Sequence, residues 1–265
     1  MSTISAPGAR GGSARPAASV PRGISRTYLV LELRRLVRNR RTLVFSLVMP
    51  PVFFLIFGTS PAYAHQSAGR GNVTAYVLVS MALYGAILTA TAGGASVSVE
   101  RAQGWTRQLR LTPLRPSAYI ATKLAATMAL SAVSIAVTLA VGSLRDPQMP
   151  LSAWVGCALV AWVGSVVFAA FGLFMGYLLP AENVMQILGP GLALLSFAGG
   201  LFIPLGDGLF ADIARFTPTY GLAELTRAPL TGDGFTLAAV ANVLVWTAVF
   251  AGGAAWRFRK DTARV

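Results

Sequence analysis

Long apolar segments alternate with short charged ones along most of the chain. Charged side chains are almost absent from six apolar segments, which cover residues 42–60, 73–99, 117–144, 152–179, 184–205 and 235–256. Each segment is long enough to cross the ~30 Å hydrocarbon core of a bilayer as a helix. The pattern therefore predicts an all-α integral membrane protein, with a six-helix transmembrane domain over residues 42–256.

Proline and glycine interrupt two of these segments. Pro50-Pro51 is predicted to kink or break the first helix at its middle, and Gly189-Pro190-Gly191 to break the fifth. The second segment carries small residues, among them Gly93 and Gly94, that favour close contact between membrane helices. Lys123 lies near the start of the third segment, where we expect its long side chain to reach the cytoplasmic interface.

A different pattern precedes the first span. Residues 1–24 are rich in Ser, Ala, Gly, Pro and Arg, and we interpret them as a disordered cytoplasmic tail. Within residues 25–41 one helical face is apolar, formed by Leu29, Leu33, Leu36 and Val37. Glu32 and most of the arginines lie on the other face. This segregation predicts a basic amphipathic helix at the inner headgroup layer.

The stretch between the fifth and sixth spans is too long for a simple turn and too apolar for a free loop. Residues 206–234 contain apolar side chains at helical spacing, and Pro218 separates two helical units. We predict two short re-entrant helices that fold back into the outer leaflet. The candidate residues of this outer gate or re-entrant region are Pro204, Phe210, Phe216, Pro218 and Tyr220.

Basic residues are distributed unequally between the predicted loops. With both termini inside, the cytoplasmic segments hold 18 of the 22 Lys and Arg residues. Because this bias follows the positive-inside rule, we expect a multi-pass protein of the inner (plasma) membrane, with the tail at 257–265 also cytoplasmic. A signal peptide that ends at Ala62-Tyr63-Ala64 is an alternative, but its basic and apolar regions would both be unusually long.

The loop at residues 100–116 joins the second and third spans and carries four arginines. Gly104 and Pro113 bracket a segment in which Trp105 and Leu109 stand four residues apart, so a helix would place both on one face. A short cytoplasmic helix with such a face is suited to docking in a partner's groove. An ordinary charged loop, with Trp105 as an interfacial aromatic, is the alternative.

Composition and motifs exclude several kinds of chemistry. Of the 265 residues 55% are hydrophobic and 12% charged, and the net charge of +13 gathers beside apolar segments, which favours lipid over nucleic acid as its partner. The sequence contains no GxxxxGK[ST] motif for ATP, no catalytic constellation, no metal-ligand cluster and no acidic residue in the middle of a span. Cys157 is interpreted as a structural thiol. A transporter of this kind needs its energy from another subunit.

Three places in the sequence resemble the ABC-2 family of ATP-binding-cassette permeases, which includes daunorubicin-resistance, polysaccharide and lipid exporters. The family's E-R/K…G…L…T-P-L loop is similar to Glu100-Arg101, Gly104, Leu109 and Thr112-Pro113-Leu114. Its motifs around the fifth span are similar to Gly199-Gly200, Phe202, Pro204, Thr217-Pro218, Tyr220 and Leu225. The amphipathic helix also matches in place, so the resemblance covers residues 25–260. Many members have Gly-Thr where this chain has Gly104-Trp105.

The resemblance implies a dimer of permeases that exports an amphiphile such as a drug, an antibiotic or a lipid. It implies two copies of a separate ABC ATPase, which bind ATP and Mg, and no cofactor or enzymatic activity on this chain. The ATPase-coupling residues that it implies are Glu100, Arg101, Gly104, Trp105, Arg107, Leu109, Thr112 and Pro113.

The family's placement of spans one and five at the dimer interface bears on a second set of residues. This placement implies that four residues are candidates for the translocation path: Phe53, Phe54, Met185 and Phe197. Without it, they would be interpreted as core or lipid-facing residues. A membrane protein that does not transport, such as a sensor-associated or immunity protein, is the alternative function.

Overall fold

The structure is a computed structural model that describes residues 26–104, 116–203, 205–206 and 208–263. Its helices in the first half are α1 (Arg26–Arg38), α2 (Arg40–Phe57), α3 (Pro61–His65), α4 (Val73–Ala95), α5 (Val97–Ala102) and α7 (Pro116–Gly142). Those in the second half are the 3-10 helix η1 (Ser143–Arg145), α8 (Leu151–Gly164), α9 (Val166–Leu178), α10 (Ala181–Ala198), α11 (Leu209–Ala214), α12 (Pro218–Thr231) and α13 (Leu237–Ala263). One short antiparallel hairpin, β1 (Ser67–Ala68) with β2 (Gly71–Asn72), pairs Ser67 with Asn72.

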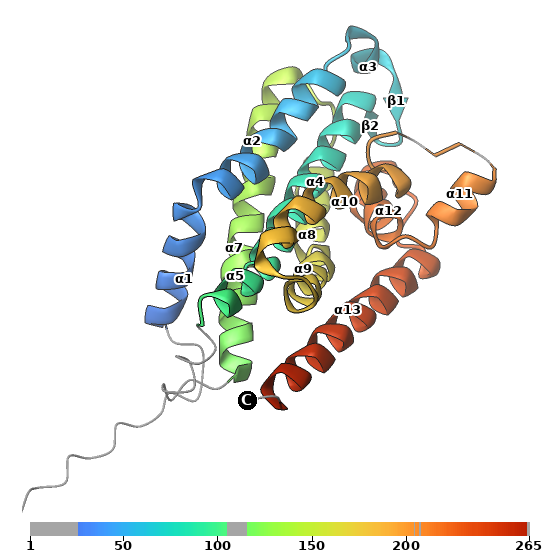
Figure 1. Cartoon of the computed structure of the whole chain (residues 1–265). Helices are drawn as coiled ribbons and strands as arrows, with labels where there is room; N and C mark the ends of the chain where they lie inside the picture. The colour runs from blue at the N-terminus through green and yellow to red at the C-terminus, as the bar shows by residue number, and fades with distance from the viewer. Residues whose placement is uncertain (1–25, 105–115, 204, 207, 264–265) are drawn as a thin grey trace, which may run out of the picture.

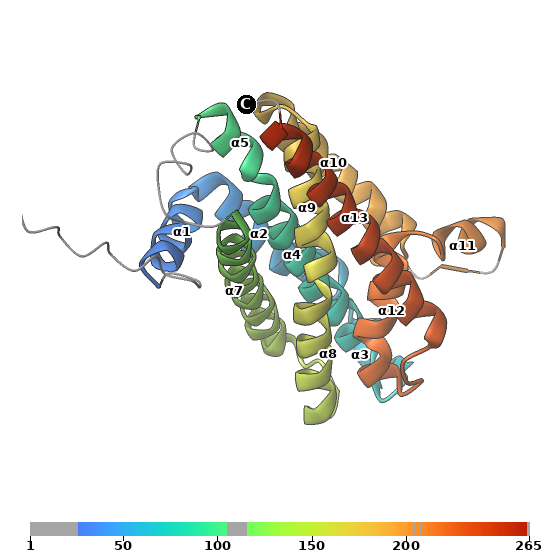
Figure 2. The ribbon, with the colours of Figure 1, turned by 90° about the horizontal axis from the view of Figure 1, so that it is seen from below.

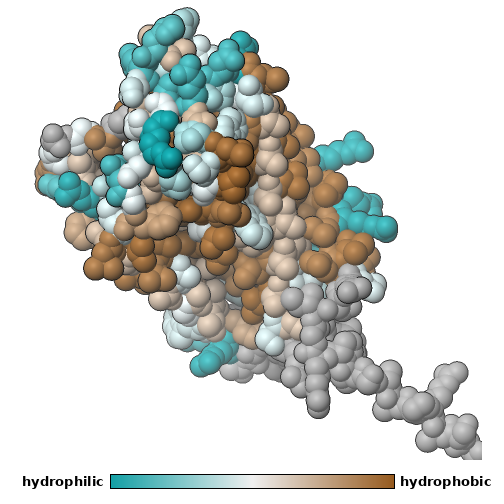
Figure 3. All heavy atoms as spheres, turned by 180° about the vertical axis from the view of Figure 1, so that it is seen from behind, coloured by the Kyte–Doolittle hydropathy of each residue, from teal (hydrophilic) through white to brown (hydrophobic). Residues whose placement is uncertain are grey.

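The helices form an elongated bundle with two distinct ends (Figure 1). At one end lie α3 and the β1–β2 hairpin, and at the other lie α5, the start of α1 and the end of α13. The latter end carries the predicted cytoplasmic segments. A broad apolar band separates the two ends on the surface (Figure 3), as expected of a protein whose middle is surrounded by hydrocarbon.

Helix α4 is the centre of the bundle and contacts α2, α7, α8, α9, α10 and α12 (Figure 2). Leu78, Leu83 and Ile87 of α4 are completely buried. In the most apolar part of the span Val73–Ala102, 78% of the residues are buried, whereas in that of Leu237–Lys260 only 17% are. The second apolar segment of the sequence is therefore the core of the protein, and the last one lies at its edge.

Glycines allow close contact between α4 and α9. A Cβ atom at Gly94 would lie 2.4 Å from the carbonyl oxygen of Ala169, and one at Gly172 would lie 2.1 Å from the carbonyl oxygen of Thr91. No side chain fits at either position without moving backbone. The predicted role of small residues in the second span is confirmed.

Four helical stretches are long and apolar enough to cross a membrane, judged by length and composition over the described residues. They are Val73–Ala102, Ser117–Arg145, Leu151–Leu178 and Leu237–Lys260, and a fifth results if the bent pair Thr27–Arg38 and Leu43–Phe57 is one span. Helix α10 is outside this set because polar residues occupy its first turns. The structure thus confirms an all-α membrane fold, while the count of six spans stays a prediction.

Proline does not interrupt α2 or α10. Helix α2 runs through Pro50 and Pro51, and α10 runs through Pro190, so the predicted break of the fifth segment at Gly189-Pro190-Gly191 is wrong. A membrane helix tolerates a proline when neighbouring helices pack around it. Pro50 lies directly against Gly85 of α4. Helix α10 also ends at Ala198, earlier than the predicted end near residue 205.

Two helices occupy the stretch between α10 and α13, close to the predicted positions. Helix α12 is buried along most of its length and packs on α4, α8, α10 and α13. Helix α11 projects from the bundle (Figure 1), and its Leu209 and the following Phe216 are each 78% exposed. Contact of α11 with the outer leaflet stays a prediction.

Candidate functional site

A cluster of charged side chains is buried where α1, α5 and α7 meet. Lys123 Nζ of α7 donates hydrogen bonds to Glu32 Oε1 of α1 at 2.7 Å and to Glu100 Oε1 of α5 at 2.5 Å. It donates a third to Ser96 Oγ at 2.8 Å. Lys123, Glu32 and Glu100 are 2%, 3% and 1% exposed. The expectation that Lys123 extends to the cytoplasmic interface is wrong, because two carboxylates satisfy its charge inside the protein.

Two further side chains complete the site, which we call the charged cluster: Glu32, Arg35, Glu100, Tyr119 and Lys123. Arg35 Nη1 of α1 lies 2.7 Å from Glu100 Oε1, and the Tyr119 hydroxyl of α7 donates to Glu100 Oε2. The cluster holds two carboxylates and two cations and so carries no net charge. Neutrality and filled hydrogen-bonding positions are what make burial of ion pairs tolerable.

The amphipathic helix is present, but its buried side differs from the sequence interpretation. Glu32 of the predicted polar face is buried against α7, while Val37 of the predicted apolar face is 54% exposed, as a side chain that meets lipid would be. The reason is that α7 offers Lys123 as a partner for Glu32.

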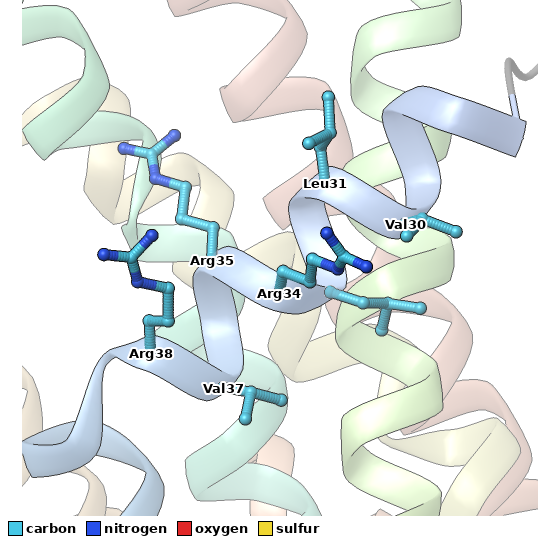
Figure 4. Close-up of a pocket in the computed structure, with 7 residues that line it drawn as sticks. Val30, Leu31, Arg34, Arg35, Val37 and Arg38 are labelled. Atoms are coloured by element: carbon cyan, nitrogen blue, oxygen red, sulfur yellow. The ribbon is translucent and has the colours of Figure 1, made fainter.

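The outward side of α1 is both apolar and basic. Figure 4 shows Arg35 and Arg38 extending to one side of the helix, with Val37 on another. A hollow of about 660 Å³ lies along it, lined by Val30, Leu31, Leu33, Arg34, Arg35, Val37 and Arg38. Apolar and basic side chains together suit a headgroup layer or a partner protein.

Arg101 fastens the end of α5 to the end of α9. Its Nη1 donates to the carbonyl oxygens of Gly176 at 3.2 Å and Tyr177 at 3.0 Å, and its guanidinium lies 5.5 Å from the centre of the Tyr177 ring. These are among the last carbonyls of α9, which have no partner within their own helix. Glu100 and Arg101 thus join α5 to three other helices, α1, α7 and α9.

The remaining candidate coupling residues are placed only in part. Gly104 has a φ of 72°, in the left-handed region that glycine favours, and no atom of the described residues lies within 4 Å of where a Cβ would be. Outside the described residues lie Trp105, Arg107, Leu109, Thr112 and Pro113.

The translocation-path candidates have different environments. Phe54 is fully buried in a cluster with Leu78 and Met81. Phe53 stacks on Tyr84 at 6.2 Å between ring centres, and Phe197 is 49% exposed. Met185 is part of α10, and its side chain lies outside the described residues.

The outer candidates are also dispersed. Pro218 is the first residue of α12, and the Thr217 side chain caps that helix by accepting from the Tyr220 backbone N–H at 3.3 Å. Phe210 of α11 and Phe216 are both exposed, at 63% and 78%, and Pro204 lies outside the described residues.

Sequence reasoning missed the pairing of Glu32 with Lys123 and the burial of Arg227 in α12, which is 8% exposed. A signal existed for the first pair. Glu32 is the one acidic residue of residues 25–41, and Lys123 is the one charged residue of residues 117–144. Isolated charges of opposite sign in adjacent apolar segments are candidates for pairing.

The fold and the charged cluster define a multi-pass helical membrane protein without a visible catalytic centre in its described part. Residues 59–257 match the sequence model of the ABC-2 family transporter proteins, and the chain belongs to this family. The chain is therefore an ABC-2 transport permease. It is 26% identical over 207 residues to the putative transport permease YvfS of Bacillus subtilis (strain 168), an alignment that covers 75% of this chain and 83% of that protein.

Proposed function

We propose that the chain is the permease subunit of an ATP-driven exporter of amphiphilic molecules such as drugs or lipids. In this proposal two copies form a homodimer, and each copy docks on a separate ABC ATPase that binds ATP and Mg. Membership of the family supports the ATPase partner. The observation that carries the coupling role is the charged cluster, which joins α1, α5 and α7 beside the loop at 100–116.

The charged cluster would transmit movement of that loop into the bundle. A push on the loop acts first on the end of α5, where Glu100 is bound to Arg35 of α1 and to Lys123 of α7. Breaking a buried ion pair costs about 3–5 kcal/mol when it leaves one buried charge without an opposite charge beside it. The three helices would therefore move as one body rather than slide past one another.

A six-span topology with both termini cytoplasmic is part of the proposal. Helix α10 begins beside Ala95 of α4, because Val184 and Leu188 pack on that residue. Just after the end of α10, the carbonyl oxygen of Gly200 accepts a hydrogen bond from Arg227, which also donates to Ser80 of α4. Ala95 and Ser80 are 15 residues apart on one continuous helix, about 22 Å at 1.5 Å per residue. Helix α10 thus covers most of the thickness of a bilayer core. The exposed apolar side chains of α2 and α10 are available for the second copy.

Docking tests the proposal. The purified chain alone is expected to hydrolyse no ATP above background, and activity and transport of amphiphiles in vesicles are expected once its partner ABC ATPase is added. Changing both Trp105→Ala and Leu109→Ala removes two anchors, each worth ~2–4 kcal/mol at a binding hot spot, so affinity for the ATPase should fall at least ~30-fold. Co-purification of the two proteins measures the loss.

Arg107→Ala is the matched control in the same loop, because a helix places Arg107 off the face of Trp105 and Leu109. It should weaken binding less, with a stronger dependence on salt. Wild-type affinity of the double alanine variant would remove the docking helix from the proposal. Hydrolysis of ATP by the chain alone, after contaminating ATPases are removed, would refute the two-subunit function.

A further inference from the structure

A second polar site lies at the opposite end of the bundle from the charged cluster. A cavity of about 300 Å³ is formed between α12, the first turns of α4 and the segment that follows α10. Its titratable side chains carry both signs of charge, from Arg215, Glu224, Arg227 and Asp233, and Tyr76 and Tyr220 add aromatic walls.

Arg227 is the fixed point of this cavity. Its Nε and Nη2 donate to Ser80 Oγ of α4 at 3.0 and 2.7 Å. Its Nη2 also donates to the carbonyl oxygens of Gly200 and Leu201, both at 3.0 Å. The guanidinium lies 4.3 Å from the centre of the Tyr76 ring. The side chain is therefore held in one orientation by two other segments.

The positive charge of Arg227 is not neutralised by any residue that the structure describes. None of the ion pairs found there includes Arg227: Arg215 pairs with Asp212 at 3.5 Å, and Glu224 Oε1 accepts from the Thr236 hydroxyl at 2.6 Å. Its hydrogen bonds to Ser80, Gly200 and Leu201 all have neutral oxygens as acceptors. A buried cation without a counter-charge is costly, so a negatively charged group in the cavity would relieve the cost.

Depth and size indicate what kind of molecule supplies that group. Ser80 is the eighth residue of α4, so Arg227 lies about 10 Å below the start of that helix at 1.5 Å per residue. Counted from the outer surface of a bilayer about 40–45 Å thick, this depth is just inside the hydrocarbon boundary, within reach of a lipid head group. The volume is at the lower limit of ligand pockets and accommodates a head group, leaving acyl chains outside.

The acidic side chains in the same cavity restrict the choice further. A purely anionic head group would gain the attraction of Arg227 but would meet repulsion from Glu224 and Asp233. A head group with a phosphate and an amine satisfies both signs. We propose that this cavity binds the zwitterionic head group of an outer-leaflet phospholipid, with the phosphate on Arg227 and the amine on the Glu224 and Asp233 side. The proposal concerns binding to this chain and does not require coupling to an ATPase.

Binding is measured with the full chain purified in detergent, by native mass spectrometry and by the midpoint of thermal unfolding. Phosphatidylethanolamine, phosphatidylglycerol and soluble phosphoethanolamine are added in parallel. Phosphatidylethanolamine should be retained at one molecule per chain and raise the midpoint most. Equal binding of phosphatidylglycerol would show that the cavity does not select a zwitterionic head group. Equal binding of soluble phosphoethanolamine would show that the ligand need not be a lipid.

Variants connect this binding to the cavity. Arg227→Gln should abolish it but also removes the hydrogen bonds to Ser80, Gly200 and Leu201. Two changes that leave these bonds intact therefore decide the matter. Gly206→Trp adds a large side chain to the lining of the cavity, at a position where a Cβ meets no described atom within 4 Å, and Glu224→Gln removes the partner of the amine. Each should reduce affinity for phosphatidylethanolamine about tenfold or more.

The matched control is Arg145→Gln, which removes an exposed arginine at the same end of the bundle. It should bind phosphatidylethanolamine as the wild type does. Unchanged binding by Gly206→Trp would overturn the site. Unchanged preference of Glu224→Gln for phosphatidylethanolamine over phosphatidylglycerol would overturn the role of the carboxylate.

Discussion

Lys123 and Lys260 are the two lysines of the chain, and their surroundings are opposite. Lys123 is buried among carboxylates, while Lys260 is exposed and lies 3.9 Å from the centre of the Trp256 ring. Because removal of any one charge leaves the charged cluster with a net charge, each of the four contributes more to stability than an ordinary surface charge does. The consequence can be tested one residue at a time.

Lys123→Met should lower the free energy of unfolding by about 3–5 kcal/mol, since it leaves two buried carboxylates with one cation. Adding Glu32→Gln restores neutrality, because Glu100 then pairs with Arg35. The double variant should thus regain about 0.5–3 kcal/mol relative to the sum of the single changes. Thermal unfolding in detergent measures both effects.

Lys260→Met is the control, and its effect should be within about 1 kcal/mol, as for an exposed charge. If the effects of Lys123→Met and Glu32→Gln simply add, the two residues do not act as one neutral unit.

At the scale of helices, the stability of the bundle depends on how closely α4 and α9 approach. The small side chains of α4 allow this approach, and Gly172 of α9 lies against the carbonyl group of Thr91. Backbone atoms cannot move aside as a flexible side chain can. A single methyl group at this crossing therefore has to push two helices apart.

Gly172→Ala should destabilise the protein by about 1–3 kcal/mol or more, the usual cost of overpacking. Gly252→Ala is the matched change in α13, where no atom lies within 4 Å of the added methyl group. It should alter the unfolding midpoint little, because a helix loses at most about 1 kcal/mol by carrying Gly instead of Ala. Similar midpoints for the two variants would mean that α4 and α9 do not pack this closely.

At the scale of the whole molecule, the apolar band and the distribution of charge define two faces. The hairpin at one end and α5 at the other lie on opposite sides of the band (Figures 1 and 3). The positive-inside rule predicts that the end with α1, α5 and the end of α13 faces the cytoplasm, as in the proposed topology.

Cysteine labelling in intact cells tests this orientation. In a Cys157→Ala background, Ser67→Cys in the exposed hairpin should react with a membrane-impermeant maleimide added outside. Gln103→Cys, exposed just after α5, should react only once the membrane is opened. Labelling of Gln103→Cys from outside would reverse the proposed topology.

The sequence by itself determined the features that depend on local patterns. Apolar length marks α4, α7, α8 with α9, and α13, because a helix in hydrocarbon satisfies its own backbone and needs only enough apolar residues. The periodicity of residues 25–41 indicated α1, and the spacing within 206–234 indicated α11 and α12. The glycines of α4 signalled close packing for the same local reason.

Only the tertiary structure decided which charges are buried and with what partners. Glu32 and Lys123 are 91 residues apart in sequence, and Ser80 and Arg227 are 147 apart. Periodicity assigns a charged residue to the polar face of its own helix, whereas its burial depends on whether a distant helix offers an opposite charge or a hydrogen-bonding oxygen. The same holds for α10, where packing against α4 stabilises a helix through Pro190 that local propensity alone would interrupt.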